Sequence, residues 1–239
     1  MDNIGYTSLT RQSGLMREMQ TVANNIANAS TTGFRREGVI FSEFVHNLEQ
    51  ADPSLSMARA NTRAIDLSQG TLTQTGGTFD FAIEGDGFFL VDGADGQYLS
   101  RAGSFTPSAE GELMTADGYR LLDAGGSPVF VPPGAQSIIL SRDGTMSADG
   151  NPLSNIGLYV PTDPNDLLHR SGVLFEAPGG VEPALTEPVI LQGFVENSNV
   201  DPIIEVARMI EVQRSYELGQ QFLETEDQRI RSVLKTVMG

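Results

Sequence analysis

Residues 201–239 read DPIIEVARMIEVQRSYELGQQFLETEDQRIRSVLKTVMG, and this stretch decides the fold. Asp201 is a suitable N-cap, and Pro202 suits the first position of a helix. Apolar residues then recur at every seventh position: Met209, Tyr216, Leu223, Ile230 and Val237. This spacing is that of a coiled-coil seam rather than the broad apolar face of a globular helix. We therefore expect a long helix within residues 196–239.

The opening stretch also has the pattern of a helix. Residues 3–29 contain no proline. Their apolar residues form rows at helical spacing: Leu9, Met16 and Ala23; Met19 and Ile26; Leu15 and Val22. Such rows favour an amphipathic helix. We expect it within residues 1–32, paired with the C-terminal helix in a coiled-coil-like α domain.

The middle of the chain has a sequence pattern that is typical of β-structure. Short apolar runs, such as Phe79–Ile83 and Val189–Phe194, are separated by glycine-containing turns. The dipeptide Asp-Gly, which readily forms tight hairpin turns, begins at Asp86, Asp92, Asp95, Asp117, Asp143 and Asp149. We expect a central antiparallel β-rich domain over residues 72–195, inserted between the two helices. Residues 33–71 show little periodicity, and we expect them to form an extended connector. The predicted fold class is α+β.

Three asparagines lie near the expected end of the first helix: Asn24, Asn25 and Asn28. Asparagine is a poor helix former that prefers to bond backbone groups in turns. One interpretation is a frayed helix end, with Gly33 stopping the helix in a left-handed conformation. The other is that the amides bond to neighbouring subunits, where a buried asparagine fixes the register of packing. Both interpretations remain open at this point.

The charge of the chain is concentrated in its middle. The net charge is −16, and residues 41–199 account for −15 of it, with 21 acidic residues against six arginines. The two ends are nearly neutral, which favours them as contact surfaces over the mutually repelling middle. No basic stripe is present that could neutralise phosphates, so nucleic acid is disfavoured as a partner.

The sequence contains no convincing catalytic, cofactor or metal motif. The Asp-Gly turns lack the alternating acidic ligands of a calcium loop. The segment Gly85-Asp86-Gly87 lacks the third glycine of a dinucleotide loop, because Leu90 stands at that position. His46 and His169 lie in unrelated contexts, and cysteine is absent. We expect no catalytic residues, no cofactor and no metal.

The N-terminus does not have the basic and apolar regions of a conventional secretory signal, and no segment has the length and hydrophobicity of a membrane span. From composition alone the protein is either cytoplasmic or exported by an unconventional route. We expect no direct membrane insertion.

Three motifs in order along the chain resemble the signatures of the flagellar rod and hook proteins. The first is ANNIANASTTGF at residues 23–34. The second comprises QGTL at 69–72, FAIEGDGFF at 81–89 and RAGSF at 101–105. The third comprises LQGFVENSNV at 191–200 and MIEVQRSYE at 209–217. Phe79-Asp80-Phe81 departs from the leucine-containing run usual at that place in the family.

The resemblance implies a structural subunit of the bacterial flagellar basal-body rod, not an enzyme. It implies export by the flagellar type III apparatus without a cleaved signal, and a periplasmic position in the rod, where the subunit transmits torque from motor to hook. The implied partners are copies of itself and other proximal and distal rod subunits. The length and the opening residues Met1–Leu9 resemble the proximal-rod members, with the distal-rod members as the alternative.

Assembly through the terminal helices predicts a set of interface residues. These are Leu9, Met16, Met19, Asn24, Asn25, Ile26, Asn28, Gly33, Met209, Tyr216, Leu223, Ile230 and Val237.

Two functions of other classes compete with rod assembly. A secreted β-rich carbohydrate-binding module or hydrolase would need exposed aromatic platforms and a defined carboxylate pair, yet the chain has no tryptophan and its apolar regularity lies in the ends. A cytoplasmic coiled-coil adaptor fits poorly with a β-region of about half the chain.

Overall fold

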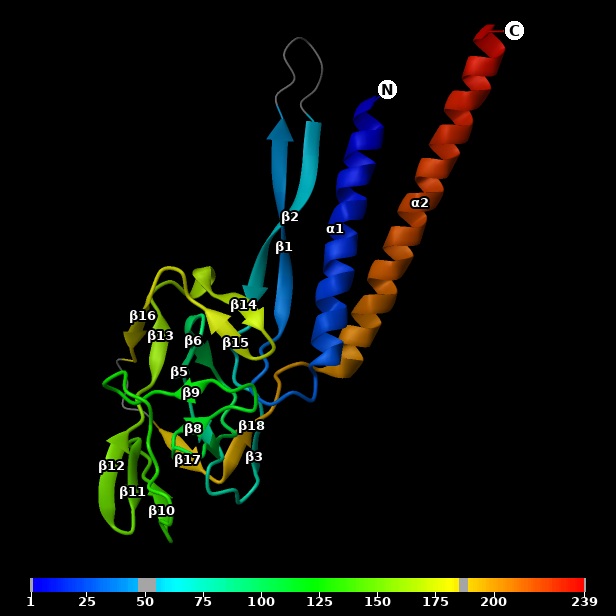
Figure 1. Ribbon diagram of the computed structural model, residues 1–239. Helices are drawn as coiled ribbons and strands as arrows, with labels where there is room; N and C mark the ends of the chain where they lie inside the picture. The colour runs from blue at the N-terminus through cyan, green and yellow to red at the C-terminus, as the bar shows by residue number, and fades with distance from the viewer. Residues whose placement is uncertain (1, 47–54, 185–188, 239) are drawn as a thin grey trace. The chain divides into compact units, whose positions relative to one another are not determined.

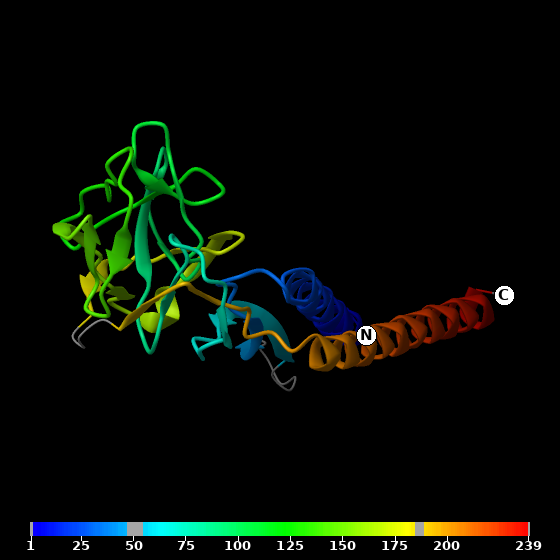
Figure 2. The same cartoon turned by 90° about the horizontal axis from the view of Figure 1, so that it is seen from below.

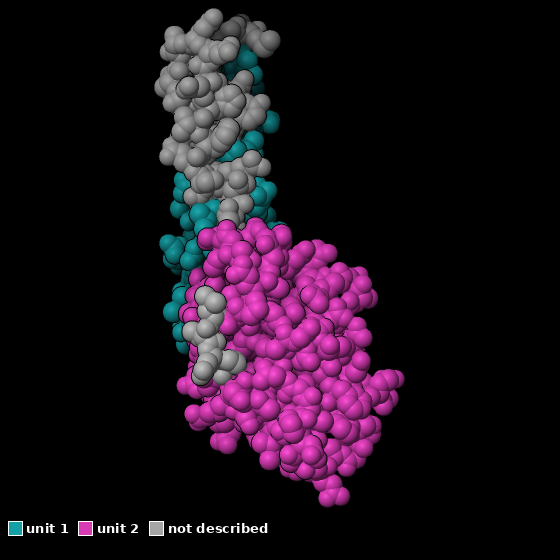
Figure 3. All heavy atoms as spheres, turned by 90° about the vertical axis from the view of Figure 1, so that its left-hand side faces the viewer, with its two compact units in different colours: residues 1–27, 37–64, 201–239 teal, residues 28–36, 65–200 magenta. Residues whose placement is uncertain are grey.

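The computed structural model describes residues 2–46, 55–184 and 189–238; within these ranges the side chains of residues 2–7, 41–46, 55–63, 237 and 238 are not described. The chain divides into two compact units (Figure 3). Unit 1 comprises Met1–Ala27, Glu37–Ala64 and Asp201–Gly239. Unit 2 comprises Asn28–Arg36 and Ile65–Val200. Each unit is therefore assembled from segments that are far apart in the sequence.

Unit 1 contains the two long helices, α1 (Asp2–Ala27) and α2 (Pro202–Met238). Helix α1 runs alongside the first part of α2 (Figures 1 and 2), and the two helices spread apart toward the N-terminus of α1 (Figure 1). The start of α2 is as predicted, because Asp201 Oδ1 accepts hydrogen bonds from the backbone N–H groups of Ile203 at 2.9 Å and Ile204 at 3.2 Å. This satisfies two of the amides that a helix N-terminus leaves without an intrahelical partner.

Helix α1 ends earlier than residue 32. After Ala27 the chain forms a turn in which the Thr31 N–H donates to the Asn28 carbonyl and the Thr31 hydroxyl donates to Asn28 Oδ1. These local bonds offer the backbone an alternative to the helix, which explains its end at this point. Gly33 does adopt a left-handed conformation, with φ of 75°, but it lies beyond this turn and belongs to unit 2.

Two strands occupy most of the region that the sequence predicts as a connector. Strands β1 (Glu37–His46) and β2 (Leu55–Ile65) form a two-stranded sheet and run in opposite directions (Figure 1). Apolar and polar residues do not alternate clearly in these two segments, so the sequence pattern does not predict the two strands. Strand pairing depends on a partner elsewhere in the chain, which a local pattern does not reveal.

Unit 2 is the antiparallel β-rich middle that the sequence predicts. Its largest sheet has the order β14-β15-β6-β5-β9-β8-β7, and the remaining pairings are β10-β11-β12, β13-β16, β17-β4 and β18-β3. Among the described residues, the paired strands of unit 2 are all antiparallel. The strands are β3 (Leu72–Gln74), β4 (Phe81–Ile83), β5 (Phe89–Gly93), β6 (Gly96–Ser100), β7 (Thr106–Pro107), β8 (Leu113–Met114), β9 (Arg120–Leu121), β10 (Ile138–Leu140), β11 (Thr145–Ala148), β12 (Asn151–Asn155), β13 (Tyr159–Pro161), β14 (Leu168–Ser171), β15 (Leu174–Glu176), β16 (Val181–Pro183), β17 (Ile190–Gln192) and β18 (Phe194–Glu196), with a short 3₁₀ helix at Pro164–Asp166.

Several of the Asp-Gly dipeptides lie in turns, as the sequence predicts, whereas Asp92-Gly93 forms the end of β5. Asp149 and Gly150 join β11 to β12, and both have positive φ, at 51° and 83°. Two consecutive residues of positive φ match the right-handed twist of a hairpin.

The core of unit 2 is built from apolar side chains of many strands. One cluster includes Phe81, Phe89, Leu113, Leu121 and Met146, and a second gathers around Phe88, Leu99 and Phe175. The architecture as a whole is α+β, with a helix near each end and an antiparallel β-rich middle.

Candidate assembly interface

The predicted seam of α2 is only partly covered in unit 1. Met209, Tyr216 and Leu223 are half-buried, and Ile230 is exposed. The side chain of Val237 lies outside the described residues. On α1, Leu9 and Met16 are exposed, whereas Met19 and Ile26 are half-buried. The predicted residues therefore flank the most buried line of each helix.

The most buried positions of the helices form mixed polar and apolar rows. On α1 they include Leu15, Glu18, Val22 and Asn25, which follow one another in steps of three and four, with Gly14 and Thr21 buried beside them. On α2, Glu205 and Val212 are buried, and Gly219 and Glu226, which continue the seven-residue spacing, are half-buried. Apolar periodicity misses these rows because polar residues occupy half of their positions. The spacing itself was the only signal that could have found them.

Side-chain bonds join α1 to α2 directly. The guanidinium group of Arg208 donates to Glu18 Oε1 from Nη2 at 2.8 Å and from Nε at 3.0 Å. Farther along, Gln12 Nε2 donates to the backbone carbonyl of Tyr216 at 3.0 Å. Gly219 makes room for this bond, since a Cβ at residue 219 would lie 2.1 Å from Gln12 Nε2.

Asn25 links three elements of unit 1. Its Oδ1 accepts the Glu37 N–H at 2.9 Å, and its Nδ2 donates to the Glu37 carbonyl at 2.8 Å and to Glu205 Oε2 at 3.1 Å. The side chain is fully buried. Its amide therefore bonds inside the chain, to the start of β1 and to the first turn of α2. This differs from both sequence-based interpretations, a frayed helix end and a bond to a neighbouring subunit.

The other residues of the ANNIAN segment have different surroundings. Asn24 is exposed, and Asn28 is half-buried in the turn that follows α1. Gly33 is buried in unit 2, where its N–H donates to the Glu196 carbonyl at 2.7 Å. A Cβ at residue 33 would lie 2.2 Å from the Ala102 nitrogen, so Gly33 serves a close approach of two backbones within the unit.

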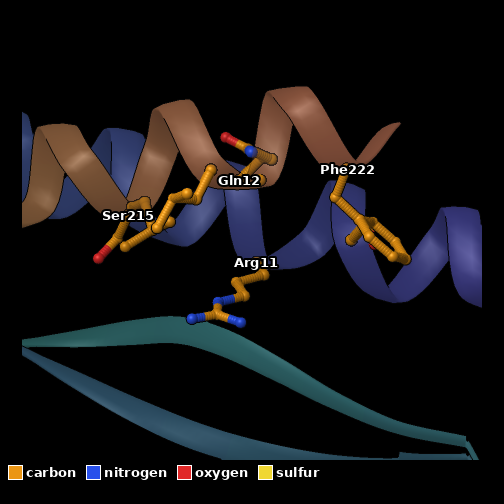
Figure 4. A pocket seen from close by; sticks show the side chains of 8 residues that line it. Arg11, Gln12, Ser215 and Phe222 are labelled. Carbon is orange, nitrogen blue, oxygen red and sulfur yellow. The ribbon is translucent and has the colours of Figure 1, made fainter. Parts of the chain in front are cut away.

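A hollow of about 390 Å³ lies between α1 and α2 (Figure 4). In the close-up Phe222 projects from α2 on one side of the hollow, and Arg11 projects from α1. Leu218 and Phe222, on α2, are 66% and 46% exposed. The full lining consists of Ser8, Arg11, Gln12, Leu15, Ser215, Leu218, Gly219 and Phe222.

Further apolar side chains of α2 are exposed over its whole length. They include Ile203, Ile204, Val206 and Ile210 near the start and Ile230, Val233 and Leu234 near the end. Contiguous exposed apolar surface marks sites of protein interaction.

The described residues contain no group of three or more His, Asp or Glu side chains placed to hold a metal ion. Across the same part of the chain, neither helix is apolar over a sufficient length to cross a bilayer. The imidazole of His169 lies against the rings of Phe34 and Phe175, with Nε2 at 3.2 Å from the Arg35 carbonyl oxygen. This is a packed position. The side chain of His46 lies outside the described residues.

Three family models match in the order of the three motifs. They are described as a flagella basal body rod protein at residues 6–35, the flagellar hook protein FlgE/F/G D1 domain at 82–148 and the flagellar basal body rod FlgEFG protein C-terminal at 191–236. The flagellar basal-body rod protein FlgF of Mesorhizobium japonicum is 38% identical, over 95% of this chain and 96% of its own. The chain belongs to the flagellar basal-body rod protein family.

Other rod proteins match over similar lengths. The FlgF of Caulobacter vibrioides is 35% identical over 98% of each chain, and the FlgG of Bacillus subtilis is 29% identical over 96% of this chain and 97% of its own. The FlgF relatives thus match at higher identity than this FlgG. The protein is a structural subunit of the flagellar basal-body rod and belongs to the motility apparatus.

The two terminal matches of this rod subunit cover the residues that build the helix contacts. Residues 6–35 include Gln12, Glu18 and Asn25, and residues 191–236 include Glu205 and Arg208. The central match, residues 82–148, lies wholly within unit 2.

Proposed function

We propose that this rod subunit assembles through α1 and α2, which pack in a coiled-coil-like arrangement with the helices of neighbouring subunits. It occupies the proximal rod in the periplasm and transmits torque from motor to hook. It is exported by the flagellar type III apparatus without a cleaved signal, and it acts without catalysis or cofactor. Its partners are copies of itself and other rod subunits. A distal-rod position is the alternative, because FlgG proteins also match over most of the chain.

The observation that carries this proposal is the apolar surface of α2 that α1 does not cover. Helix α2 has 37 residues and α1 has 26. At about 1.5 Å per residue, α2 is longer by roughly 16 Å. Leu218 and Phe222 are exposed beside α1, and Val233 and Leu234 are exposed nearer the C-terminus. One partner helix leaves these side chains in water.

Burying this apolar surface between subunits would lower the free energy of the assembly. Covering a fully exposed Leu, Ile or Phe contributes on the order of 1.5–3 kcal/mol, so a few such residues per subunit offset much of the cost of association. The interface that we propose retains Leu9, Met16 and Ile230, which are exposed, and the half-buried Met209, Tyr216 and Leu223. It adds Leu218 and Phe222 at the hollow.

A matched pair of substitutions tests the proposal. Phe222→Glu places a carboxylate at the hollow, where a neighbouring subunit would desolvate it without a partner, at a cost of several kcal/mol. Gln220→Glu makes the same change of charge at an exposed polar position two residues away. We expect both variants to be exported and to melt like the wild type, and only Phe222→Glu to lose incorporation into purified basal bodies. Complete rods containing the Phe222→Glu chain would refute the proposed interface. Electron microscopy of labelled rods distinguishes the proximal from the distal position.

A further inference from the structure

The chain crosses between the two units at four places, after residues 27, 36, 64 and 200. Within unit 2, three segments carry these crossings: residues 28–36, 65–70 and 196–200. The three segments are bonded to one another by a few side chains. We call Arg35, Arg101, Glu196 and Asn199 the connection cluster.

Glu196 lies in the third segment and accepts hydrogen bonds from the other two. Its Oε1 pairs with Arg35 Nη1 at 2.8 Å and accepts the Gly70 N–H at 2.8 Å. Its Oε2 pairs with Arg101 Nη1 at 3.0 Å. The backbone carbonyl of the same residue accepts the Gly33 N–H. The side chains of Glu196, Arg35 and Arg101 are all buried.

Asn199 joins the same segments from a second position. Its Oδ1 accepts the Arg36 N–H at 2.7 Å. Its Nδ2 donates to the carbonyl oxygens of Asp66 at 3.0 Å and Ser68 at 2.9 Å. The Asp66 N–H in turn donates to the Arg36 carbonyl at 2.8 Å, and the guanidinium group of Arg35 donates to the Ser68 carbonyl. The amide of Asn199 therefore uses its acceptor on one segment and its donors on another.

The backbones of these segments approach closely. A Cβ at Gly70 would lie 2.0 Å from the Asn197 carbonyl oxygen, and one at Gly33 would lie 2.2 Å from the Ala102 nitrogen. Real side chains do not tolerate such distances, so the spacing of the segments is narrowly defined.

The electrostatics of the cluster point to positioning rather than to simple stabilisation. Two guanidinium groups share one carboxylate, and burial lowers the pKa of Arg101 to about 10 and also lowers the pKa of Arg35. Within the described residues, Arg35 Nε, Arg35 Nη2 and Arg101 Nε are buried without a hydrogen-bond partner. Buried ion pairs are weak sources of stability, because desolvation offsets their attraction, whereas they can specify one arrangement.

We infer that Glu196 and Asn199 are positioning residues that hold the three connecting segments of unit 2 together as one joint, so that mechanical load entering through the connections does not pull them apart. The inference rests on the proposed function, since only a subunit that transmits torque carries such a load. Covalent connections alone would let the segments separate under tension, and the joint adds cross-links between them.

Asn199 allows the sharper test because its replacement by alanine leaves no unpaired buried charge. Asn199→Ala removes the bonds to Arg36, Asp66 and Ser68. Asn199→Asp keeps the acceptor for the Arg36 N–H but turns a carboxylate oxygen toward the Asp66 and Ser68 carbonyl oxygens, so it loses both donors. Asn197→Ala is the matched control, since this nearby asparagine bonds Thr73 Oγ1 instead. In purified full-length protein we expect the Arg36 amide to exchange about tenfold faster with solvent in Asn199→Ala, as befits the loss of one hydrogen bond, and to remain protected in Asn199→Asp and Asn197→Ala.

The decisive readout is motility under load. In a strain lacking the native gene, we expect Asn199→Ala to restore complete rods and swimming in thin medium but to lose swimming in viscous medium. Asn199→Asp should lose it too, because both variants lack the donors to Asp66 and Ser68, whereas Asn197→Ala is unaffected. An equal response of Asn199→Ala and Asn197→Ala to viscosity would overturn the inference. So would failure of Asn199→Ala to build rods despite normal melting, because the residue would then act in assembly. A wild-type chain that restores no rods refutes the proposed function instead, and the exchange experiment still decides whether Asn199 holds the segments.

Discussion

At the scale of single residues, Glu196 is expected to contribute strongly to stability. Glu196→Ala leaves the buried guanidinium groups of Arg35 and Arg101 without their carboxylate. Removing one partner of a buried ion pair typically costs about 3–5 kcal/mol. Urea unfolding followed by circular dichroism measures the loss. As a control, Asp92→Ala breaks the more exposed pair with Arg120 and is expected to cost at most about 1 kcal/mol. Similar losses for the two variants would contradict the assigned importance of Glu196.

Gly33 offers a second test, because two physical demands coincide there. Gly33→Ala must hold a side chain at a φ of 75° and at an impossible distance from the Ala102 backbone. Gly118 has a similar φ, 86°, but open space around its Cβ position. We expect Gly118→Ala to cost about 1–3 kcal/mol from backbone strain alone and Gly33→Ala to cost clearly more. Thermal melting of both variants measures the difference, which is the contribution of the close approach.

At the scale of elements, Asn25 determines how the end of α1 meets β1 and α2. Asn25→Ala leaves the backbone N–H and carbonyl of Glu37 without these bonds in a buried setting, at about 1–3 kcal/mol for each such group. Gln20→Ala changes an exposed amide side chain of the same helix and is expected to shift stability by no more than about 0.5 kcal/mol. Chemical denaturation of the two variants compares these values. Equal stabilities would mean that the bonds of Asn25 do not hold the elements together.

Some secondary-structure elements can be predicted from the local sequence pattern alone. The cap at Asp201, the helix from Pro202 and the hairpin at Asp149-Gly150 are confirmed, because each depends on neighbours in the sequence. The strands at Glu37–His46 and Leu55–Ile65 were not predicted, because each requires the other as its partner.

At the scale of the whole molecule, the set of segments that make up unit 2 changes which fragments limited proteolysis should yield. The sequence alone predicts disordered ends in the free monomer and a resistant core of roughly residues 70–195. The structure adds residues 28–36 to that core, since Arg35 is buried against Glu196. After mild trypsin treatment of the monomer, which cuts after arginine, we expect the peptide of residues 18–36 to remain bound to the fragment that begins at Ala64. Native mass spectrometry detects this complex, and Glu196→Ala should release the peptide. Release from the wild type would show that unit 2 does not need the N-terminal segment.

Sequence by itself determined the α+β class, the two helices, the antiparallel middle and the resemblance to rod proteins. These properties follow from periodicity, capping, turn chemistry and motif order, all of which are local or additive along the chain. Tertiary structure decided which helix faces are buried. Glu18 and Glu205 lie on the buried rows, while the predicted Leu9, Met16 and Ile230 are exposed.

Tertiary structure alone also decided the roles of Asn25, Glu196 and Asn199. Asn25 bonds a residue 180 positions away, and Asn199 bonds residues more than 130 positions away. A polar side chain is stable in the interior only when folding brings its partners within hydrogen-bond distance. No residue spacing in the sequence predicts that these side chains come within hydrogen-bond distance of their partners. Their roles can therefore be identified only from the folded structure.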